Sequence, residues 1–371
     1  VMPMQGDKGM KALYFCPVDW RWIKQRPQFL AEQLQHYCDL KALYPWKNRR
    51  KGLQSGEIPT VDIQPYFTLP ELGGRVGWLK SCNRIWVRAQ VARVLRKEKP
   101  DMLWLTMPWQ VDFLPKGLNC RIVYDCMDDY EAISMQQEER EKTLRQEAEL
   151  IARAEMIFVS SDHLLHLLMR RHGVSEGRLY LLRNGYSSSW VRAAENAKTP
   201  DSLLRIAYFG TIGRWFDFGI LLQSLDVFPN LEYQLYGPLE NGVSVPNHAR
   251  LHVCGVVEHD RIPEKASVVD AVIMPFLPTD VVQSVDPVKL YEYIFLDKPI
   301  VCVRYPEIER FAPYVEFYET KDQFNAAIQR LFDHREPKYT RRQADIFLEK
   351  NTWFVRGKCA AERMGLITTE E

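Results

Sequence analysis

The stretch LRIAYFGTIGRWFDFGILLQSL, residues 204–225, indicates the fold class most clearly because its pattern predicts a strand, a turn and a helix in direct succession. The run LRIAYF is apolar and of strand length, as in strands that are buried on both faces of a sheet. Gly210 and Gly213 lie in the turn that follows, and Asp217 stands where the cap of the next helix belongs. A strand that runs directly into a helix predicts an α/β fold with a parallel sheet.

The same alternation extends to both ends of the chain. Apolar runs of strand length precede residue 185 in KALYFCPV, LKALYP, DMLWLTM, RIVYDCM, EMIFVSS and LYLLRN, and follow residue 225 in EYQLYG, RLHVCG, AVIMPF and PIVCV. The segment 184–202 loses the pattern and collects Ser, Asn, Gly and Pro, so it is the candidate linker. We expect two doubly wound Rossmann-like domains, residues 1–186 and 187–351, with a ligand site in the cleft between them.

Composition excludes several classes of protein. With 371 residues and 46% apolar content, the chain can fill two hydrophobic cores. No run of 18 apolar residues occurs, and the opening VMPMQGDKGMKALYF lacks the apolar core of a signal peptide, so we expect a cytoplasmic protein. The eight cysteines include no C-x-x-C pair and the eight histidines show no ligand spacing. Disulfides and a structural metal are therefore not expected.

The positive charge is concentrated at the N-terminus. Residues 1–100 carry 18 Lys and Arg against 8 Asp and Glu, a net charge of +10, whereas the whole chain has +1. The basic segments WKNRRKG, residues 46–52, and RVGWLKSCNRIWVRAQVARVLRKEK, residues 75–99, are rich in Trp. Such segments suit an anionic phospholipid surface, although a solvated basic helix face would have the same composition. No recognised nucleic-acid motif accompanies the charge, so a nucleic-acid partner is not expected.

A second stretch, SVDPVKLYEYIFLDKPIVC at residues 284–302, predicts a helix that runs into a strand. Asp286 stands at the N-cap and Pro287 at the first helical position. The N–H groups at such a helix start can hold a diphosphate, with Lys289 supplying a cation. Glu292 follows roughly 8 Å from the helix start, where its carboxylate can accept bonds from both hydroxyls of a ribose. The alternative is a solvated Lys289–Glu292 ion pair.

This second stretch resembles the donor-binding segment of GT-B glycosyltransferases. It is most similar to bacterial family 4 enzymes and to relatives in the synthesis of teichuronic acid and other surface polysaccharides. The segments DWRWIKQRPQFLAEQL, YDCMDDYEA, LRNGYS, IAYFGTIGRWFD and NTWFVRGKCAAERM resemble segments in the same order in those proteins. The resemblance implies an N-terminal acceptor-binding domain and a C-terminal donor-binding domain, with a helix near residues 352–371 packed back on the first.

The resemblance also implies roles for individual residues. Glu292 matches the glutamate that binds the ribose, Lys289 and Arg214 would face the diphosphate, and Gly210 and Thr211 would line the phosphate loop. The other expected donor-site residues are Tyr236, Gly237 and Val257 near the base, with Ser284 and Val285 toward the sugar. Family 4 enzymes commonly have an E-x7-E pair, and Ser284 stands where the first glutamate would be, so the sugar-facing half of the site is altered.

Three aspartates follow a strand in CRIVYDCMDDYEA. Aspartates in such a position are more often helix caps, and Asp129 is the expected one. We predict that Asp125 or Asp128 faces the acceptor hydroxyl and accepts its proton. The spacing does not match a metal-binding D-x-D motif, so no metal is predicted.

The stretch PVDWRWIKQRPQFL follows the first strand and supplies the predicted acceptor-binding residues Trp20, Arg26 and Gln28. Aromatic faces stack on sugar rings, and arginine binds phosphate groups bidentately. The alternative is a packed helix with Arg26 at the surface.

Together these features predict a metal-independent glycosyltransferase without a cofactor, and the family resemblance implies that it retains the anomeric configuration. Its donor is expected to be a UDP- or dTDP-linked sugar, and its acceptor a bacterial surface glycan or a lipid-linked glycan at the inner face of the plasma membrane. Two alternatives stay open. One is an NDP-sugar epimerase of the same architecture, and the other is a non-catalytic two-domain sugar-binding protein, which would lack the arrangement of Lys289 and Glu292.

Overall fold

The computed structural model describes residues 9–22, 24–46, 59–69, 77–134, 136–187, 190–191 and 202–368, with the backbone alone for 77–80. The chain forms two compact units, Val1–Asn184 with Trp353–Glu371, and Gly185–Thr352. The basic segment after Trp46 and residues 188–189 and 192–201 of the linker lie outside the described part. The ligand-binding cleft expected between the two domains stays a prediction.

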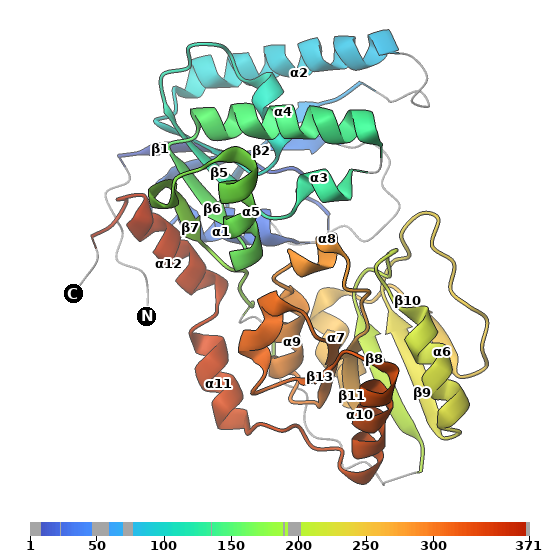
Figure 1. Ribbon diagram of the computed structural model, residues 1–371. Coiled ribbons are helices and arrows are strands. Elements are labelled where there is room, and N and C mark those ends of the chain that lie inside the picture. Colours follow the sequence, from blue (N-terminus) through green and yellow to red (C-terminus); the bar gives the residue numbers. More distant parts are fainter. Residues whose placement is uncertain are drawn as a thin grey trace. The chain divides into compact units, whose positions relative to one another are not determined.

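Unit one contains a seven-stranded parallel sheet in the order β3-β2-β1-β4-β5-β6-β7 (Figure 1). Its strands are β1 (Lys11–Phe15), β2 (Asp39–Trp46), β3 (Asp62–Phe67), β4 (Met102–Leu105), β5 (Arg121–Cys126), β6 (Met156–Val159) and β7 (Leu179–Leu181). The direction of strand succession reverses between β1 and β4. Such a switch point opens a crevice at the carboxyl ends of the strands.

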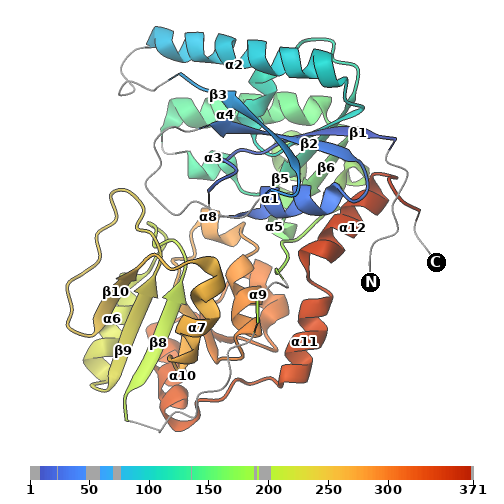
Figure 2. The ribbon, with the colours of Figure 1, turned by 180° about the vertical axis from the view of Figure 1, so that it is seen from behind.

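Helices cover both faces of this sheet, as Figures 1 and 2 show for α2 and α4 on one side and α1 and α12 on the other. The helices are α1 (Arg26–Leu34), α2 (Gly77–Glu98), α3 (Tyr130–Ile133), α4 (Gln137–Arg153), α5 (Asp162–His172) and α12 (Trp353–Arg363), with short 3-10 turns at Pro108–Phe113 and Glu176–Arg178. The C-terminal helix α12 packs on α1, where the Phe29 and Trp353 rings stack at 5.1 Å. Gly357 permits this approach, because a Cβ there would lie 2.3 Å from that of Gln33.

Unit two contains a six-stranded parallel sheet in the order β10-β9-β8-β11-β12-β13 (Figure 2). Its strands are β8 (Leu204–Phe209), β9 (Leu231–Tyr236), β10 (Leu251–Gly255), β11 (Ala271–Met274), β12 (Ile300–Val303) and β13 (Glu316–Tyr318). Its helices are α6 (Phe218–Val227), α7 (Ile262–Ser267), α8 (Asp280–Gln283), α9 (Val288–Phe295), α10 (Lys321–Asp333) and α11 (Arg341–Glu349), with 3-10 turns at His259–Arg261 and Pro306–Phe311. Here the switch point lies between β8 and β11.

The predicted fold class is confirmed, since both sheets are parallel and doubly wound. The predicted cap of α6 is also confirmed, because the Asp217 carboxylate accepts a bond from Ile220 N at 3.1 Å. Two strands, β3 and β13, were not predicted. Both are edge strands, and β3 carries Pro65, a residue that weakens a strand pattern and is tolerated at sheet edges.

Candidate functional site

Glycines meet at the carboxyl ends of β8, β9 and β10. Gly210 N donates to Tyr236 O and Gly237 N donates to Gly255 O, each at 2.8 Å. Gly210 and Gly237 have φ of +143° and +148°, and a Cβ on Gly237 would lie 1.9 Å from Gly210 O. Because no side chain fits between them, the loops after β8 and β9 present bare backbone to whatever binds there.

Helix α9 brings Lys289 onto this bare backbone. A Cβ on Gly210 would lie 2.0 Å from Lys289 Cε and 2.7 Å from Nζ, so the lysine side chain lies directly on Gly210. Nζ is 5.9 Å from the centroid of the Tyr208 ring. Burial lowers the pKa of the Lys289 ammonium, and the neighbouring Glu292 carboxylate opposes that shift. A partly desolvated cation therefore stands beside the β8–β11 switch point, where α/β sheets bind ligands.

The start of α9 differs from the prediction at Asp286, which is not the N-cap. Pro287 takes that position, with no side-chain cap, and the buried Asp286 carboxylate accepts bonds from Arg310 Nη2 and, at 3.3 Å, from Tyr291 OH. A buried carboxylate needs a cationic or donor partner, and Arg310 supplies it. A negative charge at Asp286 would repel an anion bound near Lys289. The ion pair with Arg310 offsets this charge.

Glu292 has a different partner from the one that its spacing suggests. Its Oε1 lies 2.8 Å from His259 Nε2, and among the residues that the structure describes no ion pair joins Glu292 to Lys289. The alternative of a solvated Lys289–Glu292 pair is therefore wrong for this conformation. Glu292 is partly buried, with a side chain 16% exposed, and follows Lys289 on the same helix.

The other predicted phosphate-loop residues lie at the same sheet edge. Arg214 is exposed, and its guanidinium contacts Glu240 Oε1 at 2.8 Å while its N–H donates to Glu240 Oε2 at 3.0 Å. This hydrogen bonding raises the pKa of Arg214 and also offsets its charge. Thr211 is exposed, and its carbonyl accepts a bond from Tyr208 OH at 2.8 Å.

The residues predicted near the base and the sugar are more enclosed. The Tyr236 ring stacks on Phe209 with centroids 5.0 Å apart, and Val257 packs against the core of unit two. Ser284 is fully buried between α8 and α9, where its hydroxyl donates to Val281 O at 2.7 Å. Val285 follows it, and its carbonyl accepts a bond from Tyr305 OH at 3.2 Å.

In unit one, Arg26 and Asp125 form a buried ion pair. Arg26 is 6% exposed and Asp125 is fully buried, with Arg26 Nη2 at 2.7 Å from Asp125 Oδ1 and Nε at 3.1 Å from Oδ2. Arg26 Nη1 also donates to Asn184 Oδ1 at 3.1 Å. The predictions for these two residues are therefore corrected. Asp125 is the counterion of Arg26 rather than an accessible base, and Arg26 is neither at the surface nor available to a phosphate.

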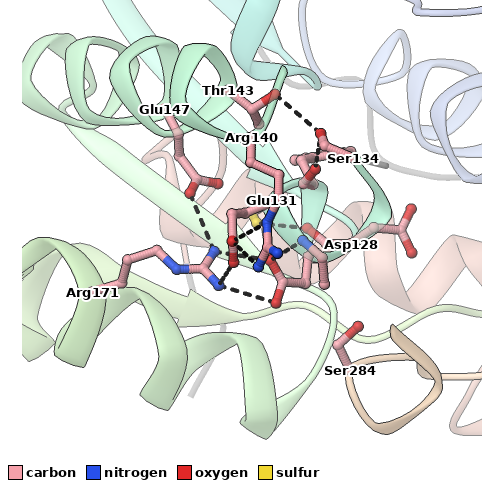
Figure 3. Close-up of polar contacts among 12 residues, drawn as sticks. Asp128, Glu131, Ser134, Arg140, Thr143, Glu147, Arg171 and Ser284 are labelled. Carbon is pink, nitrogen blue, oxygen red and sulfur yellow. Dashed lines mark hydrogen bonds and ion pairs between the residues drawn. The ribbon is translucent and has the colours of Figure 1, made fainter. Parts of the chain in front are cut away.

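The two neighbouring aspartates have separate environments. Asp129 caps α3 as predicted, accepting from Ala132 N at 3.3 Å, and pairs with Arg171 Nη1 at 2.9 Å. Figure 3 shows the Arg171 guanidinium between Glu131 and Glu147, at 3.0 and 3.7 Å. Asp128 is partly buried, and that burial raises its pKa to about 6, with Arg26 lowering it and Asp129 raising it. Asp128 is thus a carboxylate that can exchange a proton near neutral pH.

The remaining predicted acceptor residues are buried. Trp20 is 7% exposed, so its ring face is not presented for sugar stacking, which corrects the prediction. Gln28 is 1% exposed and accepts a bond from Gln25 N at 2.9 Å, while its Nε2 has no partner in the described part of the chain. In the same part, no group of three His, Cys, Asp or Glu is arranged to hold a metal ion.

The two units and their strand orders define a GT-B fold, as the sequence predicts. Solved structures that match nearly the whole chain include sucrose-phosphate synthase from Thermosynechococcus elongatus, at 12% identity and TM-score 0.70, covering 96% of this chain and 98% of that one. The apo form of the lipopolysaccharide outer core galactosyltransferase WaaB matches at 13% identity and TM-score 0.63, covering 96% and 99%. A candidate UDP-N-acetylglucosamine 2-epimerase from Listeria monocytogenes matches at 10% identity and TM-score 0.53, covering 98% of each chain. At these identities the likeness shows the fold alone.

Among curated proteins, the chain is similar to TuaH of Bacillus subtilis (strain 168), whose name describes it as a candidate teichuronic acid biosynthesis glycosyltransferase. The two are 25% identical over 221 residues, which cover 54% of this chain and 55% of that protein. The match thus spans about half the length of the relative. No family model matches the chain. The resemblance to GT-B glycosyltransferases is confirmed by this relative and by the shared fold.

Sequence reasoning missed His259, Trp190 and Arg310, which contact the predicted residues of α9 or adjoin it. Trp190 Nε1 lies 3.2 Å from His259 Nδ1, and Arg310 binds Asp286. His259 lies two residues after Val257, with no motif around it, and Arg310 follows the end of α9 by fifteen residues. No periodic or spacing signal connects these residues to α9.

Proposed function

We propose that this protein is a glycosyltransferase that takes a sugar from a nucleoside diphosphate sugar bound by unit two. The observation that carries the proposal is the position of the Lys289 side chain on the Gly210 backbone, with Glu292 on the same helix. A cation, bare loop backbone and a helix start converge there, as a diphosphate requires. The likeness to TuaH over part of both chains supports this class of activity.

The site suggests how the transfer would proceed. Lys289 and the N–H groups at the start of α9 would stabilise the negative charge that develops on the leaving nucleoside diphosphate. Binding of this anion would also reverse the lowered pKa of Lys289, because the diphosphate favours the charged ammonium. We propose a metal-independent reaction, since the chain supplies its own cation for the diphosphate, and a retaining one, as the family resemblance implies.

The chemistry of Glu292 indicates which of the two expected nucleotides the donor carries. A carboxylate can accept from both hydroxyls of a ribose, whereas a deoxyribose offers it one. The proposed donor is therefore UDP-linked in preference to dTDP-linked. The acceptor would be a surface glycan or lipid-linked glycan, and Asp128, with a pKa of about 6, is the carboxylate best tuned to accept the proton of its hydroxyl.

Calorimetric titration of UDP into wild type, Lys289→Ala and Glu292→Gln tests the site, with Lys321→Ala, an exposed lysine of α10, as the control. Loss of charge-assisted bonds at Glu292 should cost about 1.5–3 kcal/mol, which is roughly tenfold or more in affinity. Lys289→Ala should weaken UDP but not uridine, which has no phosphates. Unchanged UDP affinity in both variants would refute the donor site.

Turnover distinguishes the remaining alternatives. A glycosyltransferase releases UDP only when an acceptor is present, whereas an epimerase converts the UDP-sugar without one. A sugar-binding protein without catalytic activity would bind free sugars and ignore UDP. Incubation of UDP-hexoses with and without a lipid-linked glycan, followed by chromatography of the nucleotides, separates the three. Epimerised UDP-sugar in the absence of acceptor would overturn the proposal.

An exposed apolar patch supports a membrane-bound acceptor. At and just after the end of β3, Phe67 is 49% exposed and Leu69 is 37% exposed. On α2, Ile85 is 66% exposed and Trp86 is 49% exposed. Gln90 joins the two segments, donating to Phe67 O at 2.8 Å and accepting from Phe67 N at 3.0 Å. The segment that carries Phe67 and Leu69 thus lies beside α2, and we call these four exposed side chains the apolar patch.

Positive charge continues from this patch along α2. Arg93 and Arg96 share the exposed side of the helix with Ile85 and Trp86, and Arg84 and Arg88 are exposed as well. An apolar patch bordered by arginines suits an anionic bilayer surface, at about 1 kcal/mol per basic residue near the surface. No described helix is long and apolar enough to span a bilayer. We propose peripheral binding at the inner face of the plasma membrane.

Flotation with vesicles tests this surface. Wild type should float with phosphatidylglycerol vesicles, less with rising salt, and not with neutral phosphatidylcholine vesicles. The double variant Ile85→Ser/Trp86→Ser should lose binding, while Val268→Ser, which changes a 50% exposed residue of unit two, should keep it. Equal flotation of the double variant and wild type would contradict the proposal.

A further inference from the structure

His259 lies between Trp190 and the proposed ribose-binding carboxylate. Its Nε2 is 2.8 Å from Glu292 Oε1, and its Nδ1 is 3.2 Å from Trp190 Nε1. The Trp190 and His259 rings have centroids 4.6 Å apart, and Trp190 also packs 5.8 Å from Phe295 of α9. His259 is therefore held by packing as well as by hydrogen bonds.

The chemistry of the indole fixes the state of the imidazole. A tryptophan Nε1–H can only donate a hydrogen bond, so His259 Nδ1 must be the acceptor. In neutral His259 the proton then lies on Nε2, where it is donated to Glu292 Oε1. Trp190 is 6% exposed, so its N–H is largely shielded from water, while the His259 side chain is 38% exposed. Hydrogen bonds are therefore donated in one direction, from Trp190 to His259 and from His259 to Glu292.

We propose that His259 is a positioning residue that holds one oxygen of Glu292 and directs the carboxylate toward the ribose hydroxyls. The inference rests on the proposed donor site, in which Glu292 binds the ribose. Without the bond from His259, the glutamate side chain would lose its fixed rotamer, and ordering it would reduce the affinity for the ligand. Outer partners that orient a ligating side chain act in the same way elsewhere in proteins.

The role requires an N–H at the position of Nε2 and little else from the imidazole. Glutamine can place its side-chain Nε2 near this point, so His259→Gln should retain much of the function that His259→Ala loses. Trp190→Phe keeps an aromatic ring but removes the N–H that fixes the tautomer. These variants therefore separate donation to Glu292 from packing.

The test is titration with three ligands. For UDP, His259→Ala should weaken binding three- to tenfold, His259→Gln should restore most of it, and Trp190→Phe should lie between. For 2′-deoxy-UDP, which offers Glu292 one hydroxyl fewer, the effect of His259→Ala should shrink. For inorganic diphosphate, which contacts Lys289 without a ribose, it should vanish. A merely structural role would weaken all three ligands equally and would lower the unfolding temperature.

A double-variant cycle separates this inference from the proposal on which it rests. In the Glu292→Gln background, His259→Ala should cost less than it does in wild type, because the carboxylate that it orients is gone. If Glu292→Gln itself leaves UDP binding unchanged, the donor site fails. If Glu292→Gln weakens UDP while His259→Ala does not, the donor site stands and the role of His259 is overturned.

Discussion

Removing Arg26 should destabilise unit one strongly, because the buried negative charge of Asp125 would lose its partner. Arg26→Leu leaves the fully buried Asp125 carboxylate without its cation, which lies at 2.7 Å in the native chain. Breaking a buried pair in this way costs about 3–5 kcal/mol. In a unit of about 200 residues, each kcal/mol lowers the unfolding temperature by about 2–4 °C, so a fall of roughly 6–20 °C is expected.

Calorimetry of the full chain measures this fall. The double variant Arg26→Leu/Asp125→Leu should recover most of the lost stability, since neither charge then remains buried. The control is Arg145→Leu, which breaks an exposed pair with Glu141 at 3.9 Å on α4 and should cost less than about 0.5 kcal/mol.

A stable Arg26→Leu variant with impaired turnover would contradict this account. If its unfolding temperature stays within about 2 °C of wild type, the ion pair is not a structural necessity. Asp125 would then regain its candidacy as a catalytic base. A destabilised single variant whose loss is not relieved in the double variant would point to packing of the Arg26 side chain rather than to its charge.

Burial raises the pKa of Asp128 to about 6, so the folded state holds this proton more tightly than the unfolded state. The carboxylate therefore destabilises the fold increasingly as the pH rises from about 4 to about 6, and fully above that. Asp128→Asn should raise the unfolding temperature at pH 8 more than at pH 4 and abolish turnover, and an equal shift at both pH values would contradict this. Gly237→Ala should abolish UDP binding, because its Cβ would lie 1.9 Å from Gly210 O at a φ of +148°. Gly242→Ala, at a φ of +86° with open space, is the control, and UDP binding that survives in Gly237→Ala would argue against the loop. Turnover should persist in excess EDTA, because Lys289 supplies the cation, and loss of activity that manganese restores would refute metal independence.

The alternation of apolar runs and helices was sufficient to predict the fold class and eleven of the strands, because strand and helix patterns arise from residues a few positions apart. The strands that it missed are the edges β3 and β13. An edge strand has one neighbour and need not be apolar throughout, so its pattern is weak. Pro65 in β3 and the three-residue length of β13 weakened the pattern further.

Local rules also misplaced the start of α9. An aspartate before a proline has the sequence signature of a helix cap, and that rule gave Asp286. In the folded chain Arg310 and Tyr291 offer the carboxylate a charged and a neutral donor, and these bonds replace capping. The N-caps Asp129 and Asp217 were predicted correctly, since Asp217 accepts from Ile220 N and Asp129 accepts from Ala132 N while it also pairs with Arg171.

Features that depend on neighbours along the chain could be predicted from the sequence: glycines follow β8 and β9, and Lys289 and Glu292 lie on one helix. The partners of these groups depend on the folded chain and could not be predicted from the sequence. Lys289 lies on Gly210 of another strand–helix unit, His259 rather than Lys289 binds Glu292, and Arg26 binds Asp125 across 99 residues. Parallel sheets bring the carboxyl ends of distant strands to one edge, and the charged groups there pair according to packing and burial, for which the sequence carries no periodic signal.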